Sequence, residues 1–378
     1  MYKVSIYKSF EDLPPSFEAL FEKSSVSTGV FFSLPWFKNL AANVFDAQGP
    51  LRVYAMESNN APGTPLLVLP MRLDSSTASF LARRDLRPAA NYYSSLFGPV
   101  LDCASPGATA YLAPLAKAIA QDRPRWDTVD LHPMAKDSAV FSSTINAFRD
   151  AGMFVQSYFC FGNWYLDVAG RSYDEYFDTL PSALKNLIKR KSKRLEKSGR
   201  LRLDIVTGGA NLDSAIDAFE KIYNQSWKKP EPHPEFIPGL IRSCAKLGWL
   251  RLGLAYVDDV PAAAQLWIIT NGVASIYKLA YDEKYSDLSV GSILTAKLMQ
   301  HVIDVDRVRE VDYLTGDDSY KKDWMSHRRE RWGIVIFNLR TLHGLLAAAR
   351  HVGGRVLKNM MERIKRNSSP AMTPTVEA

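Results

Sequence analysis

The sequence lacks any apolar stretch long enough to span a bilayer. Its most apolar segments, Leu66–Pro70 and Val260–Thr270, have the length of strands and fall well short of the ~20 residues that a transmembrane helix needs. The first residues contain neither the apolar core nor the small-residue cleavage site of a secretory signal. We therefore expect a cytoplasmic protein. Peripheral contact with the inner face of the membrane is the alternative that these observations leave open.

Cysteine and histidine are scarce. The three cysteines, Cys103, Cys160 and Cys244, form no CxxC pair, and their odd number argues against a disulfide framework. The six histidines are scattered and show no zinc-ligand spacing, so we expect no metal cofactor. GxSxG, Walker and GxGxxG motifs are also missing, which argues against a serine hydrolase, a P-loop enzyme and a dinucleotide-binding domain.

The charge of the chain is concentrated in two segments. Residues 185–202 contain nine Lys or Arg and one Glu, and residues 339–366 contain seven and one, whereas the rest of the chain is net acidic. Such basic segments attract an anionic partner, which points to a nucleotide-bearing donor, a nucleic acid or a membrane surface. No base-reading element accompanies them, which argues against a protein that reads a nucleic-acid sequence.

The chain shows a weak internal duplication. Strands are predicted at 51–57, 65–73 and 126–131, and again at 250–257, 262–270, 274–281 and 311–314. Trp36 and Trp227, Arg52 and Arg251, and Asp130 and Asp312 stand at matching places, separated by about half the chain. The alternative is a chance similarity between two hairpins. The order of hairpin, strand, helix and strand predicts an α+β fold.

This pattern divides the chain into two domains, 1–160 and 161–338. A basic amphipathic helical tail is expected over 339–366, with a break near Gly353-Gly354. Residues 367–378 are rich in Ser, Pro and Thr and are expected to be disordered.

A basic helix is predicted over Leu184–Glu196. Leu184, Leu187, Ile188 and Leu195 form its apolar stripe, and cations that include Lys185 and Arg190 occupy the remaining positions. These cations lack the acidic i,i+4 partners of a purely structural face, so an anionic partner is plausible, although a solvated face is the simpler alternative.

A second candidate is the helix start at Ser289-Val290-Gly291-Ser292. Free backbone N–H groups at a helix N-terminus bind phosphate or carboxylate, and a glycine there allows close approach. Ser289, Gly291 and Ser292 are therefore candidate ligand-binding residues. The alternative is an ordinary helix cap by Ser289.

The loop that follows the last strand of the second half carries the richest chemistry. Asp317 is a candidate base for an amine nucleophile, Tyr320 a candidate acid, and Lys321 a candidate for holding an anion or an oxyanion. Asp312 is the alternative base. A charged surface loop, with Tyr320 and Trp324 packed in the core, is the competing interpretation. The proline-rich segment 228–234 could border such a site, and Tyr92-Tyr93 could line it or simply pack.

Several of these motifs together resemble a known family. They are Leu184-Lys185-Asn186-Leu187-Ile188-Lys189-Arg190, Trp227, Gln265, Tyr277–Asp282, Ser289-Val290-Gly291 and, most specifically, Gly316-Asp317-Asp318-Ser319-Tyr320-Lys321 before Trp324. Over about 165–340 the chain resembles the FemAB-related branch of the GNAT acyltransferases, with a BioF/CelD-like acetyltransferase domain. The first half resembles a degenerate GNAT unit more loosely.

The resemblance implies tandem GNAT-like domains, each with a mixed, mostly antiparallel sheet flanked by helices. It implies an N-acyltransferase that moves an acyl group from acyl-CoA, acetyl-CoA or a similar thioester to an amine-bearing small molecule or glycan precursor, in envelope, polysaccharide or lipid metabolism. Lys185, Arg190, Lys278 and Lys321 would attract the anionic carrier.

One motif departs from the family pattern. Of the GNAT pyrophosphate loop R/Q-x-x-G-x-G/A only Gly291 remains, because Leu288 and Ile293 occupy other key places. A bulkier thioester or a Fem-like aminoacyl-tRNA donor therefore stays open. A non-catalytic, membrane-associated accessory protein on a GNAT scaffold is the alternative from another functional class.

Overall fold

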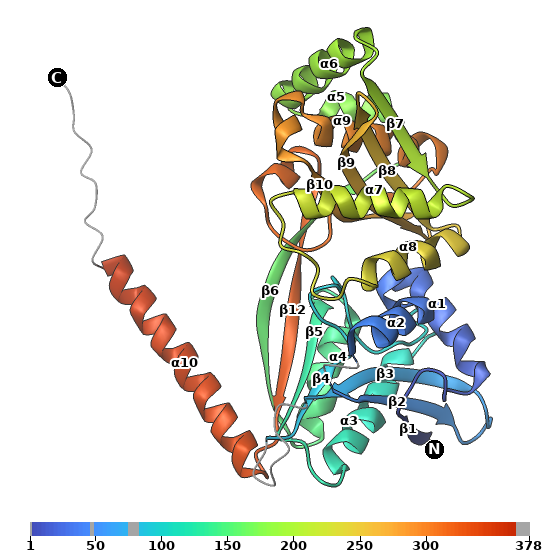
Figure 1. The fold of residues 1–378 in the computed structure, drawn as a ribbon. Helices are drawn as coiled ribbons and strands as arrows, with labels where there is room; N and C mark the ends of the chain where they lie inside the picture. Colours follow the sequence, from blue (N-terminus) through green and yellow to red (C-terminus); the bar gives the residue numbers. More distant parts are fainter. Residues whose placement is uncertain (1, 46–48, 75–82, 368–378) are drawn as a thin grey trace, which may run out of the picture.

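The computed structural model describes residues 2–45, 49–74 and 83–367, and these form an elongated α+β molecule around one sheet (Figure 1). The sheet among these residues has the strand order β1-β2-β3-β4-β5-β12-β6-β11-β10-β9-β8-β7. Its strands are β1 (Tyr2–Tyr7), β2 (Leu51–Ser58), β3 (Pro65–Leu73), β4 (Asp85–Pro88), β5 (Thr128–Ala135), β6 (Phe154–Asp167), β7 (Leu201–Val206), β8 (Leu250–Val257), β9 (Val260–Thr270), β10 (Val273–Tyr281), β11 (Glu310–Asp312) and β12 (His327–Phe337).

The two ends of this sheet repeat one pattern of strand pairing. Strands β1 to β4 are antiparallel neighbours and β4 pairs with β5 in parallel. Strands β7 to β10 are likewise antiparallel and β10 pairs with β11 in parallel. Arg52 and Arg251 lie on the matching strands β2 and β8, and Asp130 and Asp312 lie on β5 and β11. The predicted duplication and the tandem fold are confirmed.

The matching of Trp36 with Trp227 is wrong. Trp36 lies in α2, the second α-helix after β1, whereas Trp227 follows α7, the first α-helix after β7. The two tryptophans therefore stand at different places in the repeat, because a similar offset in sequence does not guarantee the same element when loop lengths differ.

Strands β6 and β12 join the two units. Strand β12 pairs with β5 of the first unit, and β6 pairs with β11 of the second, both in antiparallel fashion. β6 and β12 also pair with each other along their length at the centre of the sheet. The sheet therefore runs without interruption through both units.

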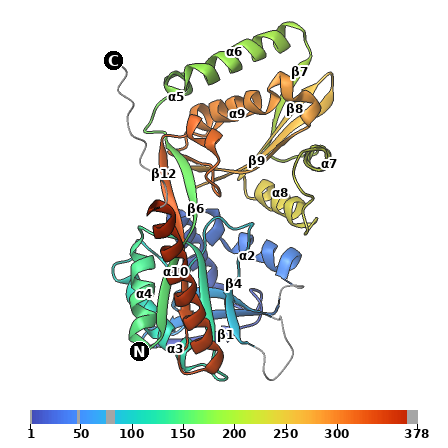
Figure 2. The same ribbon diagram turned by 90° about the vertical axis from the view of Figure 1, so that its left-hand side faces the viewer.

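The helices cover both faces of the sheet. They are α1 (Glu18–Thr28), α2 (Leu34–Leu40), α3 (Leu112–Gln121), α4 (Ala139–Asp150), α5 (Tyr173–Thr179), α6 (Ser182–Lys197), α7 (Leu212–Gln225), α8 (Phe236–Lys246), α9 (Val290–Gln300) and α10 (Leu342–Asn367), with short turns η1 (Pro15–Phe17), η2 (Val30–Phe32), η3 (Ala41–Phe45), η4 (Ala108–Tyr111), η5 (Glu283–Leu288), η6 (His301–Val305) and η7 (Ser319–Asp323). In the second unit α6 and α9 lie on one side of the strands and α7 and α8 on the other (Figure 2).

The alternation of side chains along β9 shows why both faces are covered. Leu266 and Ile268 belong to the apolar cluster that contains α7 and α8, whereas Trp267 belongs to the cluster that contains α9. All three side chains are fully buried. A strand whose successive side chains are all apolar must be buried on both faces, because they point to opposite sides.

Two helix predictions have different outcomes. The basic helix expected over Leu184–Glu196 is α6, and it buries Ile188 and Leu195 from the expected stripe. The tail is one helix, α10, so the expected break near Gly353-Gly354 is wrong. Glycine inside a helix costs about 1 kcal/mol relative to alanine, which does not by itself interrupt the hydrogen-bond ladder. Residues 368–378, expected to be disordered, lie outside the described residues.

Within the described chain, no helix has the length and apolar character to cross a membrane.

An aromatic cluster joins the two units. The Trp36 side chain is 1% exposed and makes edge-to-face contacts with Phe236 and Tyr277, with ring centroids 5.7 Å apart in each case. Tyr93 stacks on Phe236 with a centroid distance of 4.0 Å. The Asn39 side chain donates a hydrogen bond to the carbonyl of Phe236 at 3.1 Å. The first unit thereby supports the strand β10 of the second.

Candidate active site

The sheet opens between β10 and β11. The two strands pair only from Val273 with Glu310 to Ser275 with Asp312, after which β10 continues and β11 ends. A bulge interrupts the pairing of β10 with β9 between Ile276 and Lys278, so that Tyr277 has no partner in the register. Backbone groups on the opened side of β10 therefore face the space between the strands, and such groups can bind a carbonyl oxygen.

A pocket of about 240 Å³ lies at this opening. We call it the lysine pocket because Lys228, Lys278 and Lys321 all line it. The other lining residues come from both units and are Tyr92, Tyr93, Ser95, Ile276, Tyr277, Leu279, Tyr313, Leu314, Thr315, Asp318 and Tyr320. The pocket is thus a basic, aromatic cavity at the junction of the two units.

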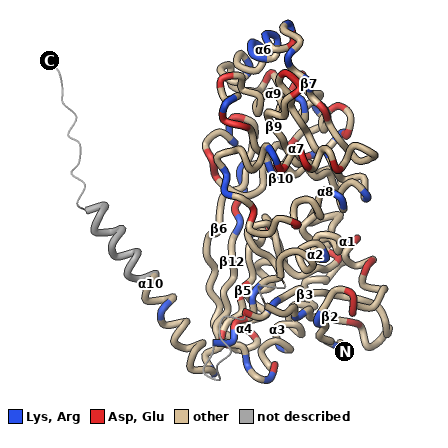
Figure 3. The backbone as a smooth tube through the Cα atoms, viewed as in Figure 1, with Lys and Arg blue, Asp and Glu red and all other residues tan. Residues whose placement is uncertain are grey.

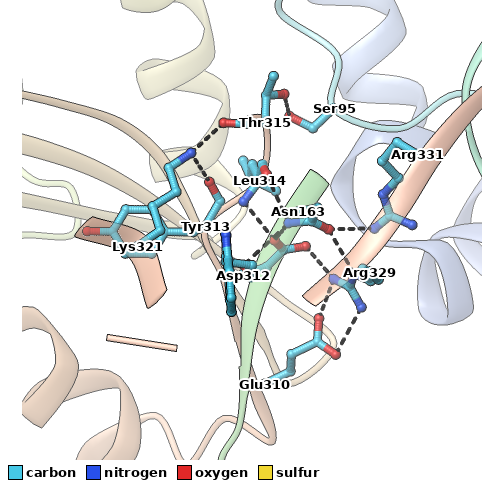
Figure 4. A network of polar contacts seen from close by, with 11 residues as sticks. Ser95, Asn163, Glu310, Asp312, Tyr313, Leu314, Thr315, Lys321, Arg329 and Arg331 are labelled. Carbon is cyan, nitrogen blue, oxygen red and sulfur yellow. Dashed lines mark hydrogen bonds and ion pairs between the residues drawn. The ribbon is translucent and has the colours of Figure 1, made fainter. Parts of the chain in front are cut away.

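Lys321 is the most buried of the three lysines. Its side chain is 6% exposed, and its Nζ donates to the carbonyl of Thr315 at 2.5 Å (Figure 4). The same Nζ lies 3.2 Å from the Asp318 carboxylate. Burial lowers the pKa of the Lys321 ammonium, against the opposing effect of Asp318. The ammonium therefore holds the loop after β11 in place and presents a desolvated positive charge at the pocket wall.

The other two lysines differ in their partners. Lys278 forms an ion pair of 2.5 Å with Glu231, which also accepts a hydrogen bond of 2.7 Å from the Tyr93 hydroxyl. Burial would raise the pKa of Glu231, but hydrogen bonds from Lys278 and Tyr223 outweigh it and the pKa is lowered. Burial and then the positive charge of Lys278 lower the pKa of Lys228 to about 8.

Tyr320 brings a phenol to the same pocket. Its ring meets the buried ring of Tyr313 edge to face at 5.7 Å, while 44% of the residue is exposed. Burial and then the negative charge of Asp318 raise the pKa of Tyr320 to about 12. At neutral pH the phenol is therefore protonated and can act as a proton donor.

The two aspartates predicted as bases lie elsewhere. Asp317 is outside the lysine pocket, where it pairs with Arg328 at 2.7 Å and accepts a hydrogen bond from Trp164 at 2.8 Å. The hydrogen bond from Arg328 lowers the pKa of Asp317. A carboxylate held by a guanidinium is a poor proton acceptor, so this position does not suit a base.

Asp312 is buried within a polar network on β11. Its Oδ1 accepts hydrogen bonds from the Asn163 side chain at 2.6 Å and from the backbone N–H of Leu314 at 2.7 Å, and its Oδ2 meets Arg329 at 2.5 Å (Figure 4). Both oxygens are occupied, so Asp312 fixes the end of β11 rather than facing the lysine pocket.

The predicted helix-start site is a separate pocket of about 150 Å³. Ser289, Gly291 and Ser292 line it together with Tyr281, Ser286 and Val290. Ser289 has a positive φ of 56° and its side chain caps nothing, so the alternative of an ordinary serine cap is wrong. The buried Gln265 side chain donates to the carbonyl of Gly291 at 3.0 Å and so fixes the first turn of α9. Tyr281 ends β10, which connects this pocket with the lysine pocket through one strand.

The remaining predicted cations, Lys185 and Arg190, lie on α6. Arg190 lines an open groove of about 720 Å³ along this helix, with Lys189 and Lys193 beside it. The Lys185 Nζ donates to the carbonyl of Asp178 at 2.8 Å. Lysine and arginine positions are concentrated along α6 (Figure 3). Lys191 of the same helix donates to the carbonyl of Asp287, so α6 passes close to the segment just before α9.

The structure adds residues that the prediction did not assign. Lys228 and Glu231 reach the lysine pocket or its wall from the proline-rich segment 228–234, which was expected only to border a site. The sequence signal was a Lys and a Glu within a run of prolines, which does not specify where such a loop folds. Within the described part of the chain, no three His, Cys, Asp or Glu side chains gather so that they could hold a metal ion.

Comparisons with known proteins agree with this arrangement. Residues 182–322 match the family model of the acetyltransferase (GNAT) domain. A search among curated proteins found no match. The solved structure of FemX is 10% identical, covers 90% of this chain and 99% of its own, and has a TM-score of 0.59.

Two further solved structures share the fold. L-PGS from Bacillus licheniformis is 10% identical, covers 91% of this chain and 98% of its own, and has a TM-score of 0.52. A conserved protein of unknown function from Bacteroides thetaiotaomicron is 8% identical and has a TM-score of 0.53. The match covers 89% of this chain and 100% of the Bacteroides chain. The predicted fold is confirmed and the predicted transferase class is supported: residues 182–322 match a GNAT acetyltransferase domain, and the described chain has the fold of FemX.

Proposed function

We propose that the protein is an N-acyltransferase whose reaction takes place in the lysine pocket. The observation that carries the proposal is the opening between β10 and β11, where a strand bulge, three lysines and a protonated phenol meet. The donor is a thioester with an anionic carrier, acyl-CoA or acetyl-CoA in the simplest case, and the acceptor is an amine on a small molecule or glycan precursor. Envelope, polysaccharide or lipid metabolism is the setting that we propose.

The geometry supports the following reaction. The acceptor amine attacks the thioester carbonyl carbon, and the tetrahedral oxyanion forms beside the opened side of β10 and the Lys321 ammonium. Lys228 in its neutral form takes the proton from the attacking nitrogen, because its lowered pKa leaves a fraction unprotonated near neutral pH. The carbon–sulfur bond then breaks, and Tyr320 supplies the proton that the leaving thiolate takes up. Amide and thiol are the products.

The helix-start pocket and α6 support binding of the carrier. Ser289, Gly291 and Ser292 surround the N-terminus of the 11-residue helix α9, where backbone N–H groups attract a phosphate. Lys278 and Tyr281 both lie on β10. Lys278 lines the lysine pocket together with Lys321, and Tyr281 lines the helix-start pocket. We assign Asp312 and Asp317 as positioning residues, which fix the end of β11 and the following loop through Arg329 and Arg328.

The experiment that tests this function is thiol release from a panel of acyl-CoA donors, each with a panel of primary amines. We expect release that requires both a donor and an amine, with the amide product visible by mass spectrometry. Mass spectrometry of small molecules that co-purify with the protein would narrow the panel. Absence of any donor-dependent release, together with no donor-induced shift in melting temperature, would contradict the proposal.

The pH dependence tests the role of Lys228. Its pKa is lowered to about 8, so the neutral, proton-accepting form becomes more abundant as pH rises through that value. We expect kcat to rise between pH 6 and 8 and to level off above about 8, because Tyr320, with a pKa of about 12, keeps its proton over this range. Lys228→Met should remove the rise and lower kcat by about 100-fold.

The exposed neighbour Lys229 provides the matched control for this measurement. Lys229→Met should keep both the rate and the rising limb of the pH profile. A Lys228→Met enzyme that retains the wild-type profile would exclude Lys228 as the base.

An aminoacyl-tRNA donor is the second candidate, and the groove along α6 favours it. Lys189, Arg190 and Lys193 line this open groove of about 720 Å³, which is large and basic enough to follow a phosphate backbone. Replacing acyl-CoA by charged tRNA in the same assay separates the two donors. Transfer from charged tRNA that falls steeply with salt, without transfer from acyl-CoA, would select this candidate.

We also propose that the tail makes peripheral contact with the inner face of the membrane in the cytoplasm. α10 leads away from the body of the molecule (Figure 1), and Leu342, Leu345 and Leu346 on it are exposed. The segment 339–366 is strongly basic, which favours anionic lipid. We expect the full chain to co-sediment with phosphatidylglycerol vesicles and a 1–338 truncation to stay in solution. Equal sedimentation of both chains would contradict this contact, whereas tail-dependent binding without turnover from any donor would favour an accessory protein.

The division into units 1–160 and 161–338 stays a proposal. The boundary cuts β6, whose first half in segment 1–160 pairs with β12 of segment 161–338, and β12 also pairs with β5 of segment 1–160. We therefore expect that neither segment folds when it is expressed alone.

A further inference from the structure

A second cavity, of about 380 Å³, lies next to the lysine pocket. We call it the arginine cavity because Arg309, Arg329 and Arg331 line it, together with Asn163, Glu310 and Asp312. Ser275 and Asp312 are paired across β10 and β11, and Arg329 is paired with Asn163 across β12 and β6. These polar side chains therefore come from four neighbouring strands at the centre of the sheet.

Arg331 is the distinctive residue of this cavity. It is only 7% exposed, and its guanidinium donates a hydrogen bond of 3.0 Å to the Asn163 side chain (Figure 4). The nearby carboxylates of Glu310 and Asp312 pair instead with Arg329, at 2.7 and 2.5 Å. Among residues 2–45, 49–74 and 83–367, no carboxylate oxygen lies within 4.0 Å of Arg331.

A buried cation without a counter-ion is unfavourable. Burial and then the positive charge of Arg329 lower the pKa of Arg331 to about 10, which still leaves the guanidinium charged at neutral pH. Charges that are taken out of water require pairing and full hydrogen bonding to be stable. The carboxylates of Asp312, Glu310 and Asp137 offset this charge only from beyond ion-pair distance, so Arg331 presents guanidinium donors and a charge without a direct partner to the cavity.

The charges around Arg331 favour a monoanion. Of the other arginines that line the cavity, Arg309 is exposed and donates to the Asn271 carbonyl, and Arg329 pairs with Glu310 and Asp312. One carboxylate would add a single negative charge beside the Arg331 guanidinium, whereas a phosphate dianion would add two beside these carboxylates. A guanidinium also matches a carboxylate in shape, because its N–H groups form a planar fork.

The arginine cavity adjoins the proposed reaction centre. Ser95 and Leu314 line both this cavity and the lysine pocket. The Ser95 and Thr315 hydroxyls are 2.7 Å apart at this junction. Figure 4 shows Lys321 on one side of the segment 312–315 and Arg329 and Arg331 on the other. A ligand anchored at Arg331 is thus held beside the place where the acyl carbonyl would bind.

From these observations we propose that the arginine cavity binds a carboxylate of the acyl acceptor. The acceptor class is then an amine that also carries a carboxylate, such as an amino acid or an acidic amino sugar. This inference rests on the proposed function for the identity of the ligand, but not for the presence of an anion site. Arg331 acts by binding substrate and takes no part in proton transfer.

The test compares matched acceptors that differ in one group. The probes are L-lysine against L-lysinamide, and muramic acid against glucosamine and glucosamine 6-phosphate, with binding measured by calorimetry and transfer by thiol release. We expect at least one carboxylate probe to bind wild-type protein at least tenfold more tightly than its neutral partner. Arg331→Met should abolish this difference and leave binding of the neutral partner unchanged, whereas Arg331→Lys should keep part of it.

Arg242 is the matched control, because it is a surface arginine paired with Asp213. Arg242→Met should preserve the preference for the carboxylate. Arg331→Lys also keeps the test decisive if Arg331→Met does not fold. Equal binding of charged and neutral partners, preference for the phosphate, failure of every carboxylate probe to bind at millimolar concentration, or preference retained in a folded Arg331→Met protein would each overturn the proposal.

Calorimetry tests the arginine site and thiol release tests the proposed acyltransferase, so the two proposals can be contradicted separately. A carboxylate preference in calorimetry without thiol release from any donor would leave the arginine site standing and contradict the proposed acyltransferase. Thiol release with equal kcat/KM for charged and neutral acceptors would support the acyltransferase and contradict the arginine site.

Discussion

Lys321→Met is expected to lower kcat for thiol release by about 100- to 1,000-fold, the range seen when one donor to an oxyanion is removed. Lys321 is nearly buried at the wall of the lysine pocket, and in wild type its positive charge lies where the oxyanion would form. Methionine keeps much of the apolar stem but has no charge. The measurement is steady-state kinetics with the donor and amine that give the highest wild-type rate.

A structural role of Lys321 must be separated from this effect. Methionine cannot replace the contacts of the Lys321 ammonium with the Thr315 carbonyl and Asp318, so Lys321→Met will also loosen the loop. Loop disorder alone would raise KM and lower the melting temperature, whereas loss of oxyanion stabilisation lowers kcat at saturating donor. The exposed neighbour Lys322 is the control, and Lys322→Met should behave as wild type. A Lys321→Met enzyme with unchanged kcat would contradict the mechanism.

Trp36→Ala is expected to lower the free energy of unfolding by about 3 to 5 kcal/mol, as for other buried aromatic residues replaced by alanine. The Trp36 side chain contacts Phe31, Phe236 and Tyr277 in the cluster that joins the two units. The cavity left behind removes support from Tyr277, the bulged residue of β10. Activity should therefore fall together with stability.

Urea unfolding followed by fluorescence and by circular dichroism provides the measurement. Trp36→Phe fills much of the volume and should lose clearly less stability than Trp36→Ala. Val26→Ala, at a side chain that is 58% exposed, should change the free energy of unfolding by less than about 0.5 kcal/mol. A Trp36→Ala protein with wild-type stability would show that the aromatic cluster does not hold the units together.

The sequence by itself determined part of the secondary structure. The alternating and continuous apolar runs predicted β2, β3, β8, β9 and β10 to within a few residues, and helical spacing of apolar residues predicted α6. These patterns are readable because burial of one or both faces imposes a period on the chain. The repeated order of elements also predicted the duplication, which the equal strand pairing in the two units confirms.

Only part of the site was readable in the same way. Tyr320 and Lys321 follow a strand end, and this local relation was sufficient to place them together at a pocket. The roles of Asp317 and Asp312 were not readable, because Arg328 and Arg329, which hold them, come from β12, which pairs with β6 rather than with β11. A carboxylate's ability to act as a base depends on such neighbours, which its own sequence position does not reveal.

The tertiary structure alone decided which residues share the central sheet. β12, β6 and β11 are neighbours in the sheet, so Asn163, Asp312 and Arg331 meet although they lie up to 168 residues apart. Likewise Lys228 and Glu231 reach the lysine pocket only because their loop folds over β10. Periodicity records which face of an element is buried, whereas strand order and loop placement depend on packing energies summed over the whole molecule, which no local pattern contains.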